Sequence, residues 1–148
     1  MKQLFIALAM ATLGLAAVPA LAQSAAPMHN DTLYQALGAK PGLEALMDVF
    51  VPALKADSRI GAQFKDTNAK YLQEQLVDQI CMVSGGPCAY KGADMKAAHA
   101  GMEINKAQFN ALVEVLQGAM DARGIPFTTQ NQLLARLAPM HRDVITAK

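Results

Sequence analysis

Apolar residues recur along the chain at the spacing expected of helices, and no segment alternates as a half-buried strand would. A first short helix is expected from Asp31 or Thr32 to Gly38, and Pro41 is expected to open a second one. The apolar face of this second helix would consist of Leu43, Leu46, Met47, Phe50 and Leu54. Pro52 lies in its interior, where the missing N–H and the ring predict a kink at a cost of about 3 kcal/mol.

The same rules predict two longer helices further on. Polar residues at 66–68 would cap a third helix, which the Ser-Gly-Gly-Pro sequence at 84–87 ends. Its apolar face would be formed by Leu72, Leu76, Ile80 and Val83. Asn105 and Gln108 predict a capping box for the next helix, which Gly124 ends. The inner face of that helix would be Phe109, Leu112, Leu116 and Met120.

A last helix is expected to begin at Thr128 or Thr129. Its inward side chains would be Leu133, Leu134, Leu137 and Met140. The content of alanine, leucine, methionine and glutamine favours helices as well. The sequence therefore predicts an all-α fold in a single domain at 31–148.

The start of the chain has the composition of an export signal. Lys2 supplies the positive charge, residues 4–18 form an uncharged apolar run, and Ala20–Ala22 is a small-residue cleavage site. Cleavage after Ala22 would remove a signal peptide at 1–22 and leave a disordered leader at 23–30. We therefore expect a periplasmic or secreted protein.

The charges of the chain are balanced. Thirteen basic residues face 12 acidic ones, which gives a formal net charge of +1, and removal of Lys2 with the signal leaves 12 of each. Such a balance indicates neither a nucleic-acid nor an anionic membrane partner. No later apolar run reaches the roughly 20 residues that a membrane helix needs, so no membrane association is expected.

The two cysteines, Cys81 and Cys88, stand on either side of the glycine-rich break after the third helix. In an exported chain, an even pair at short separation predicts a disulfide, which would join the third helix to the loop that follows. A redox-active pair is the alternative, although the spacing is not C-x-x-C. The C-x-x-C-H pattern for covalent haem attachment is missing.

One histidine, His99, stands among apolar residues on a short helical segment. An imidazole on an apolar helix face can hold a haem iron, although a lone histidine is more often a structural or surface residue. His29 lies in the leader and is a poor candidate for a buried ligand. His141, near the end of the last helix, is expected to be exposed and to interact with the last carbonyl groups.

A series of short motifs runs in order between Leu33 and Val144. The motifs are Leu33-Tyr34, Leu37-Gly38, Asp48-Val49-Phe50, Ala56-Asp57, Phe64, Gly85-Gly86-Pro87, Tyr90-x-Gly92, Met95-Lys96-x-x-His99-x-Gly101 and Leu137-Ala138-Pro139-Met140. No single motif is specific, but in their order and spacing the chain resembles a group I truncated haemoglobin. The resemblance implies a truncated globin fold, a 2-on-2 helical sandwich around haem b (iron protoporphyrin IX).

By this resemblance, His99 is the proximal iron ligand and Phe64 packs on the porphyrin. The proximal side would be lined by Met95, Met102, Ile104, Phe109 and Leu112. Burial of apolar area, at roughly 25 cal/mol per Å², would hold the cofactor. Tyr90, with Lys91 and Lys96, would lie where the propionates can be met, or at the solvated surface.

The distal side departs from the better studied family members, which usually place a tyrosine and glutamines there. Val51 stands at the tyrosine position, and Leu72 and Leu76 stand at the two distal-helix positions. The helical phase that points these leucines inward turns Gln73 and Gln75 away, unless a shifted register brings Gln75 in. Without a hydrogen bond of about 1 kcal/mol to bound O2, we expect faster O2 release.

The resemblance thus implies reversible binding of O2, NO or CO at a pentacoordinate haem iron, rather than catalysis. A haem enzyme that converts NO and O2 to nitrate or disposes of peroxide is one alternative, which the apolar distal side disfavours. A haem-free helical binding or sensing module is the other, which His99 and its glycine-rich setting disfavour. Outside the cytoplasm, ferrous iron would require an electron donor. We expect a monomer or a weak dimer.

Overall fold

The computed structural model describes residues 30–147, and the regular structure in this part of the chain is helical. The elements are α1 (Thr32–Ala36), α2 (Ala39–Ala56), η1 (Gly61–Phe64), α3 (Ala69–Val83), α4 (Met95–Ala98), α5 (Lys106–Ala122), α6 (Phe127–Leu137), η2 (Ala138–Met140) and α7 (His141–Val144). The expected signal peptide and nearly all of the leader lie outside the described residues. Among the described helices, none has the length and apolarity needed to cross a membrane.

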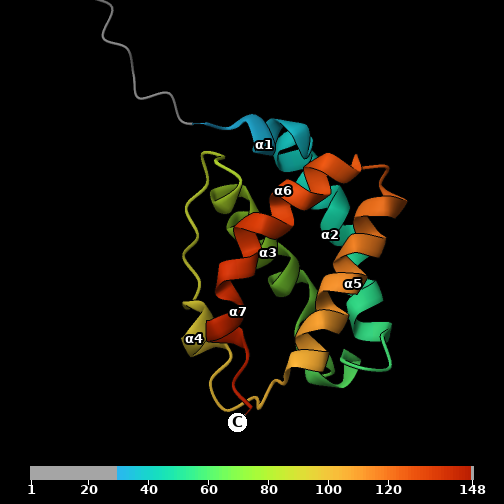
Figure 1. Ribbon diagram of the computed structural model, residues 1–148, viewed down its shortest axis with the longest axis vertical. Coiled ribbons are helices and arrows are strands. Elements are labelled where there is room, and N and C mark those ends of the chain that lie inside the picture. The colour runs from blue at the N-terminus through green and yellow to red at the C-terminus, as the bar shows by residue number, and fades with distance from the viewer. Residues whose placement is uncertain (1–29, 148) are drawn as a thin grey trace, which may run out of the picture.

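The long helices form a sandwich of two pairs (Figure 1). α2 packs against α3 and also against α5, and α5 contacts α6. α1 lies over one end, where it contacts α2 and α6, and the short α4 lies beside α7. The loop from the end of α3 to α4 runs along the left edge of the view in Figure 1.

Hydrogen bonds from side chains explain where α3 and α5 begin, and a glycine marks the break between α1 and α2. The side chain of Asn68 accepts a bond from the Tyr71 amide at 3.0 Å and so caps α3. Asn105 and Gln108 form the predicted capping box of α5, with bonds of 3.0 and 2.9 Å. Gly38, with φ of 86°, separates α1 from α2. The predicted caps of α3 and α5 and the break at Gly38 are confirmed. The second helix begins at Ala39, two residues before the predicted Pro41, because the Gly42 amide already bonds to the Gly38 carbonyl oxygen at 2.9 Å.

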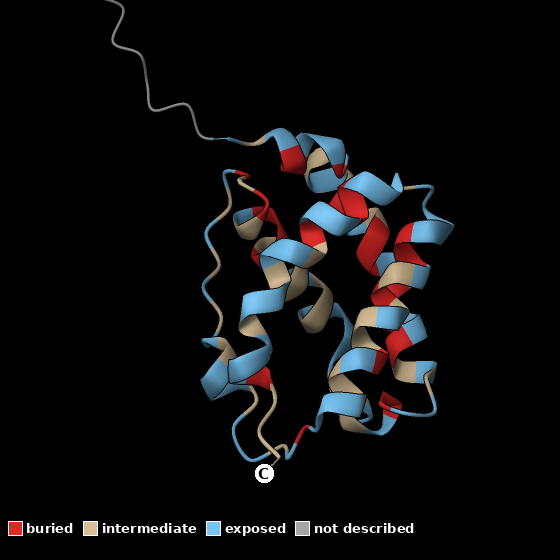
Figure 2. Cartoon of the chain, in the orientation of Figure 1, coloured by how far each residue is buried: buried red, intermediate tan, exposed pale blue. Residues whose placement is uncertain are grey.

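The core lies mainly between α2, α3 and α5 (Figure 2). The predicted apolar face of α2 is confirmed, because all five of its side chains are buried. Val51, on the same helix, is also fully buried. α2 continues through Pro52, which lies at the exposed side of the helix. The kink expected at Pro52 stays a prediction.

The prediction for the last helix is wrong in two respects. The helix begins at Phe127, because the carbonyl of Pro126 accepts bonds from the amides of Thr129 and Gln130 and makes Pro126 the N-cap. It also ends at Leu137, and a 3₁₀ turn containing Pro139 separates it from α7. Proline lacks the N–H that would continue an α-helix, so the α-helical hydrogen-bond pattern is interrupted there.

Candidate functional site

His99 is the C-cap residue of α4 and is half-buried. Its Nδ1 atom lies 2.7 Å from the carbonyl oxygen of Met95. A carbonyl oxygen only accepts hydrogen bonds, so Nδ1 carries the proton and donates it. Nε2 then keeps its lone pair, which is the form in which a neutral imidazole binds a metal.

α4 is stabilised by its own N-cap and has little contact with the core. Asp94 accepts a hydrogen bond from the Ala97 amide at 2.7 Å and so caps the helix. None of the four residues of α4 is buried. The position of His99 therefore depends on what the neighbouring segments contribute.

The apolar residues expected around the cofactor are mostly half-buried. Ile104 is buried, with 9% of its surface exposed, and Val51 is fully buried. The half-buried members are Phe64, Leu72, Leu76, Met95, Met102, Phe109 and Leu112. Among these, Phe64, Leu72, Leu76 and Leu112 pack against the core. Their remaining apolar surface is what a porphyrin face would cover.

Phe64 is the last residue of η1, and a lysine binds its carbonyl group and one further along the chain. Lys55 donates to the carbonyl oxygen of Phe64 at 2.6 Å and to that of Thr67 at 2.8 Å. These two bonds join α2 to the turn between η1 and α3. The backbone of Phe64 is therefore fixed before any cofactor binds.

Gln79 lies beside the expected site residues of α3, and the sequence assigned it no role there. Only 8% of its surface is exposed, and its Nε2 lies 3.1 Å from the sulfur of Met95 and 3.6 Å from that of Met140. It therefore bridges α3, α4 and η2 through thioether sulfurs, which are weak acceptors. Its spacing from Leu72 and Leu76 places all three on one helix face, and this was the available signal.

Gln75 faces the loop that leads to α4. Its Oε1 atom is buried and has no hydrogen-bond partner among the described residues. A Cβ atom built on Gly92 would meet both this oxygen, at 2.5 Å, and the Tyr90 hydroxyl, at 2.3 Å. Gln73, by contrast, reaches α2, where its Nε2 lies 3.2 Å from Oδ1 of Asp48.

Tyr90 uses its hydroxyl within the same loop. The hydroxyl donates to the carbonyl oxygen of Ala93 at 2.9 Å. Burial raises the pKa of Tyr90 above its usual 10.0, and Tyr71 and Asp94 add to the shift. The two lysines expected near the propionates, Lys91 and Lys96, are exposed.

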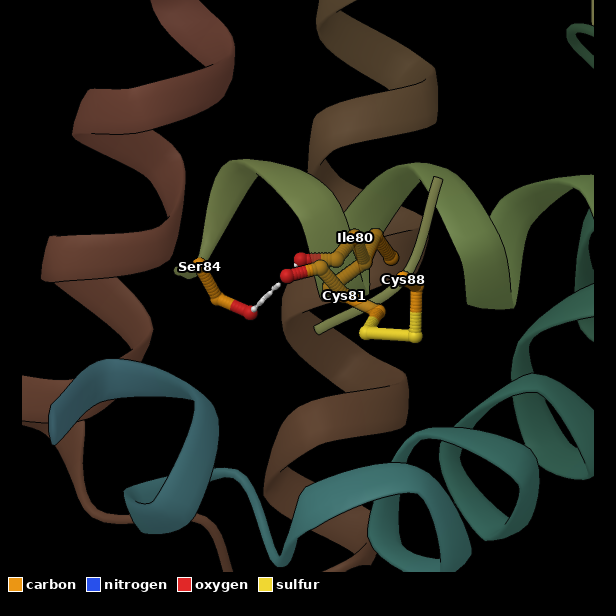
Figure 3. The surroundings of a disulfide bond; sticks show 4 residues. All are labelled: Ile80, Cys81, Ser84 and Cys88. Carbon is orange, nitrogen blue, oxygen red and sulfur yellow. Dashed lines mark hydrogen bonds between the residues drawn. A yellow bond between two sulfur atoms is a disulfide. The ribbon is translucent and has the colours of Figure 1, made fainter. Parts of the chain in front are cut away.

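The predicted disulfide between Cys81 and Cys88 is present in the structure (Figure 3). Cys81 is fully buried on α3, and Cys88 lies in the loop toward α4. Ser84 closes the helix end beside it, because its hydroxyl donates to the carbonyl oxygens of Ile80, at 2.6 Å, and Cys81, at 3.1 Å. The disulfide thus fastens the loop before His99 to α3.

His141 is the other histidine within residues 30–147. His141 is exposed, and its Nδ1 lies 2.9 Å from the Ala138 carbonyl oxygen, as expected for a helix-end histidine. Within residues 30–147, no three His, Cys, Asp or Glu side chains are placed to hold a metal ion together. A single imidazole can bind an iron whose other ligands come from a porphyrin.

Residues 32–146 match the model of the bacterial-like globin family. The chain belongs to this family. The group 1 truncated haemoglobin of Tetrahymena thermophila is 33% identical over 94 residues, which cover 64% of this chain and 78% of the relative. That of Tetrahymena pyriformis is 29% identical over 114 residues, which cover 77% and 94%. The predicted resemblance to group I truncated haemoglobins is confirmed.

Solved structures confirm the predicted truncated globin fold. The Fe(III) form of the T. pyriformis truncated haemoglobin matches with a TM-score of 0.74 at 28% identity, over 76% of this chain and 97% of that one. The 2/2 haemoglobin from Synechococcus sp. shares the fold at 20% identity, with a TM-score of 0.72. Membership of the globin family implies a haem cofactor and the binding of diatomic gases such as O2. The tautomer of His99 and the half-buried apolar side chains fit that cofactor.

Proposed function

We propose that this truncated haemoglobin holds haem b through Nε2 of His99 and reversibly binds O2, or another diatomic gas such as NO or CO, at a pentacoordinate iron. The observation that carries the proposal is the 2.7 Å bond from His99 Nδ1 to the Met95 carbonyl oxygen. In the neutral imidazole this bond places the proton on Nδ1, so the lone pair of Nε2 is free to bind iron, and it limits rotation of the ring.

Different residues of the chain would orient the imidazole and cover the porphyrin. Met95 orients the imidazole through its carbonyl group, and the half-buried apolar side chains on α3, α5 and η1 would cover the porphyrin. When bound, haem supplies an iron with one open position for a gas. Leu72 and Leu76 would give the distal side an apolar lining, and the amide nitrogen of Gln79 on the same helix face is already engaged with two thioether sulfurs. This favours simple binding over chemistry that requires a free polar group.

The disulfide supports a location outside the cytoplasm. Structural disulfides persist in oxidising compartments, and the export-like start of the chain leads to the same proposal of a periplasmic or secreted protein. In such a compartment, an electron donor would have to keep the iron ferrous for O2 to bind.

Absorption spectra of the haem-loaded protein test the proposal. They should be recorded for the ferric, ferrous and ferrous-plus-O2 states of the wild type, His99→Ala and His141→Ala. We expect a stable oxy spectrum in the wild type and in His141→Ala, and its loss in His99→Ala. Failure to bind haem, or the same spectra without His99, would contradict the proposal.

A further inference from the structure

The loop after His99 is tied to a distant part of the chain at Ile104. The Ile104 amide donates to the hydroxyl oxygen of Thr146 at 3.0 Å. In return, the Ile104 carbonyl oxygen accepts bonds from the amides of Thr146 and Ala147, each at 3.0 Å. Ile104 and Thr146 are 42 positions apart, so the pairing is a tertiary contact and not part of a turn.

The backbone between His99 and Ile104 is irregular. Gly101 and Glu103 both adopt the left-handed conformation, with φ of 76° and 51°. Glu103 carries a Cβ atom, so this conformation is strained and persists only where the surroundings impose it. Ile104 lies directly after Glu103, and its side chain is buried. The three bonds at Ile104 are therefore placed where they can hold the loop in this shape.

The segment that contains Thr146 also contacts the other side of the histidine. α7 precedes Thr146 in the chain and lies beside α4, which leads into His99 (Figure 1). α4 has no buried residue of its own. The 141–147 segment thus contacts the chain both before and after the histidine.

We propose that Thr146 is a positioning residue for His99. Thr146 and Ala147 act through Ile104 as a latch, by which we mean the three hydrogen bonds that hold the loop between His99 and Ile104 in one shape. With the latch closed, α4 and Ile104 keep a fixed spacing, and the imidazole keeps one orientation. The part of this inference that concerns iron rests on the proposed function. The part that concerns the loop does not rest on the proposed function, because the three bonds are formed by the chain without haem.

Three substitutions separate this role from a general effect on folding. Thr146→Val keeps the shape of the side chain but removes the oxygen that accepts the Ile104 amide. Thr146→Ser restores that oxygen. Thr128→Val makes the same chemical change at an exposed threonine of α6 and is the matched control.

Two readouts are needed, one without haem and one with it. Amide hydrogen exchange of the haem-free protein should show Ile104 exchanging roughly fivefold faster in Thr146→Val, as expected for loss of one hydrogen bond. In the haem-loaded protein, the ferrous iron–histidine stretching band should shift or broaden, and haem transfer to an acceptor globin should be roughly fivefold faster. Thr146→Ser and Thr128→Val should behave as the wild type does in both.

The latch would be refuted if Thr146→Val left both the exchange rate of the Ile104 amide and the iron–histidine stretching band as they are in the wild type. Equal changes in Thr146→Val and Thr128→Val would overturn it as well. If Thr146→Val does not fold, the wild type provides the test, because the amides of Ile104, Thr146 and Ala147 should open together at one rate, and unrelated rates would refute the latch. If no variant takes up haem, the proposed function fails while the exchange data still decide the latch.

Discussion

The Nδ1 atom of His99 and the carbonyl oxygen of Met95 are 2.7 Å apart, one helical turn from each other on α4. The same carbonyl accepts the His99 backbone amide at 3.2 Å. The Met95 carbonyl oxygen thus determines which nitrogen of the neutral imidazole carries the proton. The place of α4 itself depends on the neighbouring segments, because none of its four residues is buried.

An apolar distal side should release O2 quickly, and a single amide should slow that release. Leu72→Gln places a hydrogen-bond donor at a half-buried position of α3. One hydrogen bond of about 1 kcal/mol should slow O2 dissociation roughly fivefold. Stopped-flow dissociation from the ferrous protein measures the rate, and Leu72→Met is the control for side-chain shape. Equal rates in all three proteins would show that Leu72 does not face the bound gas.

The disulfide should stabilise the domain substantially. Removing it in Cys81→Ala/Cys88→Ala should lower the free energy of unfolding by about 2 to 3 kcal/mol, because the loop gains freedom in the unfolded chain. Alanine is chosen because Cys81 is fully buried and a serine would bring a polar hydroxyl into the core. Urea unfolding with and without reductant provides the measurement. The double variant should not respond to reductant, and an unchanged stability would mean that the tether contributes nothing.

The turn next to the disulfide has no room for a side chain at Gly86. A Cβ atom there would lie 2.6 Å from the sulfur of Cys81, 2.7 Å from Cδ2 of Tyr34 and 2.9 Å from the carbonyl oxygen of Cys81. Because these atoms are held by the disulfide and the core, Gly86→Ala should destabilise the protein by about 1 to 3 kcal/mol.

Gly118→Ala is the matched control for that substitution. This glycine lies inside α5, and a Cβ atom would meet nothing within 4 Å. Alanine should therefore stabilise the helix by about 0.5 to 1 kcal/mol. Thermal unfolding of both variants should give shifts of opposite sign, and shifts of the same sign would contradict the packing described around Gly86.

Tyr90 should make the protein sensitive to alkaline pH. Burial raises its pKa in the folded state above 10.0, so the folded protein holds the phenolic proton more tightly than the unfolded chain does. This stabilisation is complete below about pH 10 and is lost as the pH rises through the folded-state pKa. Subtracting the ultraviolet tyrosinate titration of Tyr90→Phe from that of the wild type should reveal a transition above pH 10. A transition at or below that value would contradict the burial of the phenol.

The sequence predicted those features that depend on neighbouring residues. Asn68 caps α3 and Asn105 pairs with Gln108 because each side chain bonds to a backbone amide three positions away. The apolar face of α2 is buried because helical spacing alone places its members together. Such local relationships can be read from a single sequence, and they account for most of the fold.

The features that the sequence did not reveal depend on tertiary contacts. Gln79 meets Met95 and Met140 only after three elements have packed together. The pairing of Ile104 with Thr146 joins positions that no local pattern connects. The sequence places the start of α6 at a threonine because threonine is a common N-cap. In the structure Pro126 is the N-cap, its carbonyl oxygen accepts the first helical hydrogen bonds, and Thr129 is buried inside the helix.

Rescue of His99→Gly by free imidazole tests whether His99 Nε2 holds the iron. The substitution leaves a space of the size of the lost ring, and dissolved imidazole can occupy it. The account predicts that ferrous His99→Gly lacks the five-coordinate, histidine-ligated absorption spectrum and that imidazole restores it, together with O2 binding. A histidine-ligated spectrum in His99→Gly without imidazole, equal to that of the wild type, would contradict the account.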